Sequence, residues 1–246
     1  MASVFKSFSN SDAVPIRSML HESLPITGSI VSGTYNANAN IKFYSHGMFE
    51  SVYDYPYLSS SANKIFDLTV GYSPSSALSS STNLQNAQKI NLYNQMAQVL
   101  MGYSSTGSIM EFDETGSTLY LSNLKMRECI FVLFSRLLVK DEIKKGSFSI
   151  TLGVSSASIN STGIPMDSLL TITDAGGQNQ FKVNSPVGEY GLLSASAGTG
   201  QAYSGSAGAF TNGYCGLLFY QAGIAVLTAS IFMASGSSYN GKVRTN

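Results

Sequence analysis

The most constraining feature of this sequence is a long segment without charge towards its carboxyl end. From Tyr190 to Gly241 there is no Asp, Glu, Lys or Arg. The segment is rich in Gly, Ser, Ala and Thr, and it contains two apolar runs, at residues 214–220 and 224–233. Because a segment like this is poorly suited to an open, hydrated surface, we expect a β-rich wall that is largely covered by other subunits.

The whole chain is poor in charge. Charged residues make up 11% of the 246 positions, whereas a soluble monomer usually carries roughly a quarter. The 14 basic and 14 acidic residues cancel, so no net charge opposes association and no basic excess favours nucleic acid. Composition therefore predicts a component of a multi-copy assembly, with no nucleic acid among its partners.

Cysteine usage and the apolar runs indicate the cellular compartment in which the protein is expected. Cys129 and Cys215 lie beside apolar runs, which favours buried thiols over a disulfide or a zinc site. Charged residues interrupt residues 1–27, so no secretory signal is expected. The best membrane candidate, residues 216–233, is divided by Gly223 and fits two strands better than a membrane span. The expected setting is intracellular and reducing.

Three regions are predicted along the chain. Residues 1–29 form an N-terminal arm, residues 30–152 an α+β region, and residues 153–246 a β-rich region of low charge. The expected fold class is mainly β with one clear helix (α+β), built on an antiparallel sandwich-like or barrel-like core.

The helix is predicted at residues 84–101. Its apolar residues recur at offsets of three and four, Thr82 or Asn83 is placed to cap its start, and Gly102 to end it. Its polar positions are amides, with Gln95 and Gln98 among them. Amides lose less free energy than charges when an interface removes water, so these two are interface candidates. A solvated amide-rich helix remains the alternative. The predicted buried face consists of Ile90, Tyr93, Ala97 and Leu100.

Three β-hairpins are expected from alternating apolar patterns and turn residues. The first joins residues 130–139 to 147–152 through a charged connection, with an amphipathic helix over 128–145 as the alternative. The second joins residues 168–173 to 180–183, and the third joins 217–220 to 224–232.

No catalytic constellation is visible. His46 reads as a turn residue, and no nucleophile elbow, phosphate loop or zinc motif occurs. Glu111, Asp113 and Glu114 lie in a predicted turn, where acidic residues are expected for solubility alone. We therefore predict no enzyme activity, and no catalytic, cofactor-binding or metal-binding residue.

Three tyrosines form the strongest interaction signal. Tyr53, Tyr55 and Tyr57 alternate around Asp54 and Pro56, which would place three phenols on one side of an extended segment. Tyrosine supplies a large contact area and a hydrogen-bonding tip, so an interface strip is predicted. An aromatic edge packed on the core is the alternative.

Three longer strings carry a family likeness: residues 51–58 (SVYDYPYL), 91–102 (NLYNQMAQVLMG) and 135–148 (SRLLVKDEIKKGSF). Over residues 40–150 the chain resembles virion structural proteins of T4-like tailed phages, especially those of marine bacteria and cyanobacteria. The resemblance implies a particle component that is made in the host cytoplasm and resides in the virion, with other virion proteins as partners. It implies no catalytic residue, and it leaves baseplate, tail, neck and head open.

Three functions follow as expectations. The leading one is a structural subunit of a contractile-tailed phage, in the baseplate, neck or tail, or else a capsid-associated protein. The second is a receptor- or glycan-binding β module of a fibre or spike that uses Tyr53, Tyr55 and Tyr57. The third, a glycan-degrading enzyme, is disfavoured because no acid/base pair is evident.

Overall fold

The computed structural model describes residues 40–79, 85–116, 125–134, 142–154, 168–197 and 214–229. These residues form an antiparallel sheet of ten strands, and within the same ranges they form one α-helix. The predicted mainly β fold with one helix is therefore confirmed. The predicted arm (1–29), the helix cap at Thr82 or Asn83 and the tail (234–246) lie outside the described residues.

The strands are not arranged in the sheet in the order of the chain. The order is β1-β2-β3-β4-β10-β9-β8-β6-β5, with β7 paired to β8. The sheet does not close on itself, which is compatible with the sandwich-like form of the prediction. The strands are β1 Ile41–Phe43, β2 Glu50–Tyr53, β3 Lys64–Tyr72, β4 Glu128–Phe134, β5 Ser149–Val154, β6 Ser168–Thr173, β7 Lys182–Ser185, β8 Gly188–Ala197, β9 Tyr214–Phe219 and β10 Ile224–Thr228, and the helix is α1 Asn86–Leu100.

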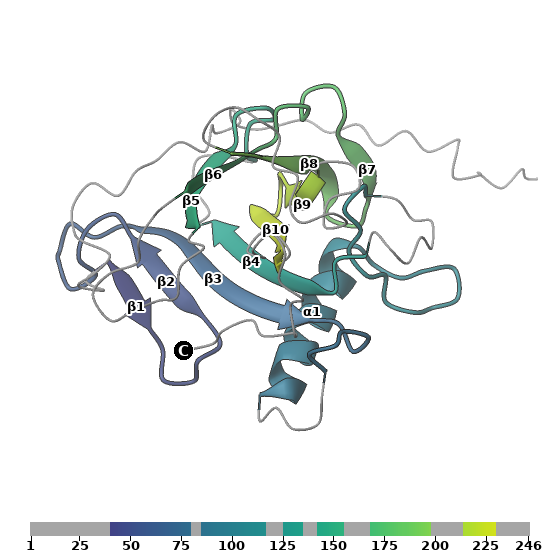
Figure 1. Ribbon diagram of the computed structural model, residues 1–246, viewed down its shortest axis with the longest axis horizontal. Helices are drawn as coiled ribbons and strands as arrows, with labels where there is room; N and C mark the ends of the chain where they lie inside the picture. The colour runs from purple at the N-terminus through teal and green to yellow at the C-terminus, as the bar shows by residue number, and fades with distance from the viewer. Residues whose placement is uncertain are drawn as a thin grey trace, which may run out of the picture.

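The last two strands lie in the middle of the sheet (Figure 1). β10 pairs with β4, where Val226 is opposite Phe131, and β9 pairs with β8, where Leu217 is opposite Leu192. One sheet thus contains strands of both the 30–152 and the 153–246 regions, which differ in composition. The predicted regions therefore describe a difference in composition, and their division into separate structural units stays a prediction.

The lack of charge in β9 and β10 is explained by burial within the chain itself. Residues 215–219 and 225–228 are all buried. Both strands have a hydrogen-bonded neighbour on each side, and covered faces leave no position where a charged side chain could reach water. For these strands the chain supplies the cover that was expected from other subunits.

One face of the sheet is covered by α1. Leu92, Tyr93, Ala97 and Leu100 of the helix belong to a buried cluster together with apolar side chains of the central strands. Tyr93 packs edge-on against Phe112 and Phe131, with ring centroids 5.5 and 6.5 Å apart. This contact fixes the helix against the middle of the sheet. The strand residues in this cluster are Cys129, Phe131, Tyr190, Leu217, Phe219 and Val226.

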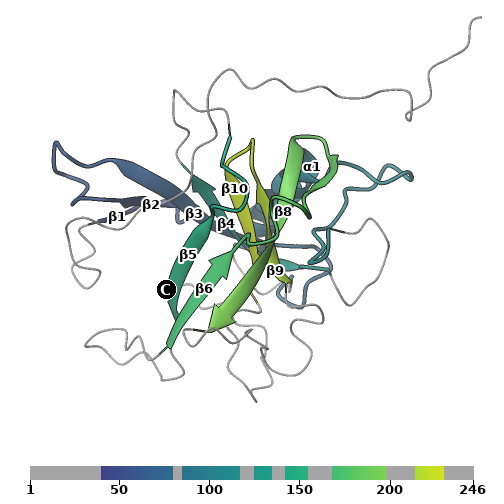
Figure 2. The ribbon, with the colours of Figure 1, turned by 90° about the horizontal axis from the view of Figure 1, so that it is seen from above.

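The opposite face is covered because the sheet curls over itself (Figures 1 and 2). Phe148, just before β5, packs against Phe134 of β4 at 5.6 Å between ring centroids, although these strands are far apart in the sheet order. Phe134 in turn contacts Phe66 of β3 at 6.0 Å. A second buried cluster fills the concave side, and it includes Val132, Ile172, Leu193, Leu218 and Leu227.

The helix confirms most of its sequence prediction. Observed bounds of Asn86–Leu100 fall inside the predicted 84–101, and Tyr93, Ala97 and Leu100 are buried as expected. Ile90 is only half-buried. Gly102 ends the helix with φ +80°, and its N–H bonds to the carbonyl of Ala97 at 3.1 Å. This is the left-handed conformation that glycine adopts without strain. Gln85 stands at the observed N-cap and makes no side-chain capping bond.

One of the three predicted hairpins is confirmed. β9 and β10 pair with Phe219 opposite Ile224, and Gly223 takes φ +65° in the turn between them. Both apolar runs of this hairpin are adjacent in sequence, so local turn chemistry was sufficient to predict it.

The other two predicted hairpins are wrong. β4 pairs with β3 and β10 instead of β5, and the alternative helix over 128–145 is also wrong because residues 128–134 form a strand. β6 pairs with β5 and β8, and β7 pairs with β8. A turn between two segments does not by itself determine that they pair, because the pairing of each strand depends on the whole sheet.

Gly71 allows α1 to approach β3 closely. A Cβ at this position would lie 3.0 Å from the carbonyl oxygen of Lys89 and 3.0 Å from the amide nitrogen of Tyr93, both on the helix backbone. We expect Gly71→Ala to lower the free energy of unfolding by roughly 1–3 kcal/mol in urea denaturation, because the helix must move outward. Gly176→Ala is the control, since its Cβ would meet only the flexible side chain of Gln180. Equal losses in the two variants would contradict this interpretation.

Candidate functional site

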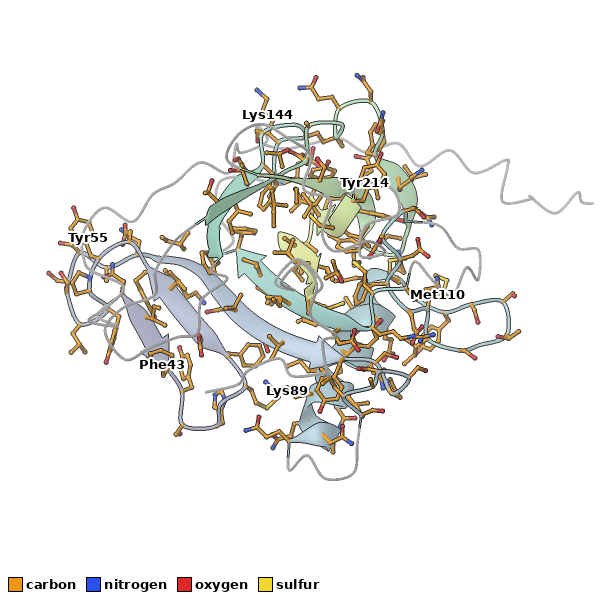
Figure 3. The ribbon with its side chains drawn as sticks, in the orientation of Figure 1. Phe43, Tyr55, Lys89, Met110, Lys144 and Tyr214 are labelled. Carbon is orange, nitrogen blue, oxygen red and sulfur yellow. The ribbon has the colours of Figure 1, made fainter. Side chains whose placement is uncertain are left out.

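A groove with both polar and apolar lining residues lies beside the middle of α1 and the loop that follows the helix. Its volume is about 960 Å³, within the range of roughly 300–1,000 Å³ that is usual for small-molecule sites. The residues that line it come from α1, from the loop after the helix, from the turn after β3 and from Lys125. Met110, labelled in Figure 3, marks the loop as it extends beside the helix. Six lining residues carry hydroxyl side chains outside the aromatic ones: Ser73, Ser75, Ser104, Ser105, Thr106 and Ser108.

Tyr93 supports the groove from below. Its hydroxyl donates to the carbonyl of Met126 at 2.9 Å and accepts from the N–H of Phe112 at 3.3 Å. The amide of Met126 also bonds to the carbonyl of Phe112 at 2.9 Å. Burial raises the pKa of Tyr93, so its phenol stays neutral and holds these two segments together.

The charged groups in and beside the groove are paired. Ser73 donates its hydroxyl to Glu111, and the other oxygen of Glu111 lies 3.8 Å from Nε of Arg127. Lys125 Nζ lies 3.2 Å from Oδ2 of Asp113, which is fully buried. The two charged residues that line the groove, Glu111 and Lys125, are thus each paired with an opposite charge beside it.

The acidic segment forms a turn as predicted, with the N–H of Gly116 bonded to the carbonyl of Asp113 at 3.0 Å, but the structure corrects the expectation that its acidic residues serve solubility alone. Asp113 is completely buried, and Glu114 is 7% exposed. Asp113 Oδ1 accepts from both the N–H and the hydroxyl of Thr115, at 2.9 and 2.6 Å. Tyr190 of β8 donates to the carbonyl of Gly116 at 3.1 Å. The segment is thus packed on the sheet. In the sequence, the only local indication of this burial is Phe112, an apolar residue that separates the acidic ones.

The outer wall of the groove is a short, internally bonded loop. Tyr103 and Ile109 form an isolated antiparallel bridge, and the N–H of Ser104 bonds to the carbonyl of Ser108 at 2.8 Å. Gly107 takes φ +80° at the tip. Tyr103 is 54% exposed at the base of this loop. No sequence motif marks this loop as the wall of a groove, because the segments that it faces are brought beside it only by the fold.

The three tyrosines do not form the extended strip that was predicted. β2 ends at Tyr53, and the chain then turns, with the N–H of Ser59 bonded to the carbonyl of Pro56 at 2.8 Å. Tyr53 and Tyr57 are brought together, with ring centroids 6.3 Å apart. Tyr55 lies at the far end of the molecule from Met110 (Figure 3). The turn residues after Asp54 overrode the period-two pattern. Whether these side chains form an interface stays a prediction.

Gln95 and Gln98 lie on the outer side of α1, and both are exposed. They are thus available to a partner, and their interface role stays a prediction. The structure does not bring them near Tyr55, which lies across the molecule from the helix (Figure 3). Asn94, next to Gln95, faces the groove instead.

The remaining candidate residues have structural surroundings. His46 stacks on Tyr44, and its Nδ1 accepts from the N–H of Met48 at 3.1 Å, as a turn residue would. Cys129 and Cys215 are buried free thiols as predicted, and burial raises the pKa of Cys215 to about 12. Within the described ranges, no group of His, Cys, Asp or Glu side chains is arranged to hold a metal ion, and no helix there is long and apolar enough to cross a membrane.

Comparison with known proteins adds no relative: no family model, no curated protein and no solved structure matches the chain.

Glu114 makes the stability of the protein depend on pH. Burial, with a smaller contribution from the charge of Asp113, raises the pKa of Glu114 to about 7 from an ordinary value of 4.5. Between these two values the folded chain binds the proton more tightly than the unfolded chain. The contribution of Glu114 to stability therefore falls as pH rises through this window.

We expect Glu114→Gln to be more stable than the wild type at about pH 8, by roughly 1–3 kcal/mol, because the amide needs no ionisation in the buried site. At about pH 4, where Glu114 is neutral in both states, the difference should disappear. Urea denaturation of both proteins at the two pH values measures this. A difference that is independent of pH would contradict the assignment.

Proposed function

We propose that the chain is a structural subunit of a contractile-tailed phage particle, in the baseplate, neck or tail, and that it acts through contacts with other virion proteins. The observation that carries the proposal is the outer side of α1, which is exposed and has no charge. The sequence resemblance to virion structural proteins of T4-like phages gives the kind of assembly.

The outer side of α1 has the character of a surface that can be covered. Its exposed residues are Ala87, Gln88, Asn91, Gln95, Gln98 and Val99. Val99 is 57% exposed, and Lys89, which carries the one charge of the helix, is buried. A surface helix normally carries charges on its outer side. Amides and an exposed valine can be dehydrated at lower cost and can bond across an interface.

The uncharged segment from Tyr190 to Gly241 gives less support to an assembly role than its composition suggested. Its described central strands, β9 and β10, are buried by the chain itself. The proposal therefore rests on α1 rather than on this segment. It includes no catalytic step.

A pair of charges on α1 should weaken assembly. We expect Gln95→Glu with Gln98→Glu to lower the affinity of association at least about tenfold, because an interface would have to dehydrate two carboxylates. Sedimentation velocity of the purified chain, alone and with other virion proteins, measures this. Mass spectrometry of purified particles tests whether the chain is present in the virion.

The matched control places the same charges on exposed glutamines away from the helix. Gln178→Glu with Gln180→Glu, in the turn between β6 and β7, should leave association unchanged. A chain that stays monomeric with every virion protein and is absent from purified particles would overturn the proposal.

A further inference from the structure

We propose that the groove beside α1 is a carbohydrate-binding site and that its ligand is a neutral oligosaccharide. This inference goes beyond the assembly role, since it assigns a ligand to a different surface of the molecule. It also differs from a receptor site at Tyr53, Tyr55 and Tyr57, because Tyr55 lies across the molecule from Met110 of the groove (Figure 3). Tyr53 pairs with Lys64 at the start of β3, whereas the groove begins at Ser73, after the end of this strand.

Hydroxyl groups dominate the polar lining of the groove. Ser75, Ser105 and Thr106 line it, and so does Asn94 of α1; the hydroxyls of Thr106 and Ser104 also bond to each other at 2.8 Å. Hydroxyl and amide groups both donate and accept hydrogen bonds. A sugar presents hydroxyls of the same dual character around its ring, so each can be matched without leaving a buried polar group unpaired.

The balanced charge of the site selects a neutral ligand. Lys125 is 3.2 Å from Asp113, and Glu111 is held by Ser73 and by Arg127 at 3.8 Å. An anion would need an excess of positive charge, which these pairs do not leave. An ammonium ligand would likewise meet carboxylates whose negative charge is already compensated.

Tyr103 supplies the apolar part of the site. This residue is 54% exposed and lines the groove together with Ile109 and Met110. The C–H face of a sugar ring is apolar, and a flat aromatic ring offers it a large contact area at low entropic cost. An exposed aromatic ring beside a row of hydroxyls therefore matches both faces of a saccharide.

The wall that carries Tyr103 is ordered without a ligand. The bridge between Tyr103 and Ile109, the bond from Ser104 to Ser108, and the bond from the N–H of Met110 to the carbonyl of Gly102 at 3.0 Å hold its shape. A wall that is already in place spares a ligand the entropic cost of ordering it.

The lining favours a saccharide over a peptide. An extended peptide is usually recognised by main-chain pairing along a strand edge or by deep apolar pockets for its side chains. The groove is bordered by a helix, a turn and a loop, and no strand edge is among the lining elements that the structure describes. Its volume of about 960 Å³ has room for several sugar rings.

The test is calorimetric titration of the purified full chain with four neutral hexasaccharides: maltohexaose, cellohexaose, mannohexaose and chitohexaose. We expect saturable binding of at least one. Tyr103→Ala should weaken that binding about tenfold or more, because the stacking surface is lost. Tyr57→Ala removes another exposed tyrosine, 36% exposed, which packs beside Tyr53 and is not part of the groove lining, and this variant should bind as the wild type does.

Several results would overturn the proposal. These are no binding of any of the four sugars, equal binding by Tyr103→Ala and wild type, or tighter binding of an anionic galacturonic acid hexamer. Tighter binding of a synthetic peptide of residues 196–209 than of every sugar would identify a peptide groove instead. Particle incorporation is measured separately, so failure here leaves the assembly role intact.

Discussion

The pairing of the β9–β10 hairpin between β4 and β8 is the contact on which the rest of the structure depends. It joins segments that are about a hundred residues apart in the chain, since Phe131 pairs with Val226, and long connections of this kind cost loop-closure entropy. Burial of apolar side chains on both faces of the central strands offsets that cost. Phe131, Leu217 and Val226 face the cluster that includes α1, and Val132, Leu218 and Leu227 face the concave cluster.

The groove is a consequence of the same packing. Once α1 lies across the sheet, the chain leaving Gly102 must return along the sheet, and Tyr93 bonds to the backbone of both Phe112 and Met126. The acidic segment is carried into the interior by this return, which places Asp113 against Lys125. The loop between Gly102 and Phe112 lies beside the helix and forms the outer wall of the groove. The site thus combines residues from four separate parts of the chain.

Charged residues are scarce in this protein for two different reasons. In β9 and β10 the scarcity reflects burial inside one chain, whereas on the outer side of α1 it persists at exposed positions. Both lack charge, although β9 and β10 are apolar and the outer side of α1 is rich in amides. This distinction moves the case for assembly from the carboxyl-terminal segment to Gln95, Gln98 and their neighbours.

The sequence by itself determined the local features: the helix and its end at Gly102, the β9–β10 hairpin, the buried thiols and the mainly antiparallel β class. Each depends on neighbours a few residues apart, so periodicity and turn chemistry are sufficient. Tertiary structure decided which strands pair, where Asp113 and Glu114 are buried, and that Ser73, Tyr103 and Lys125 line one groove. These outcomes depend on competition among distant apolar faces for the same positions in the sheet, and no local pattern records that competition.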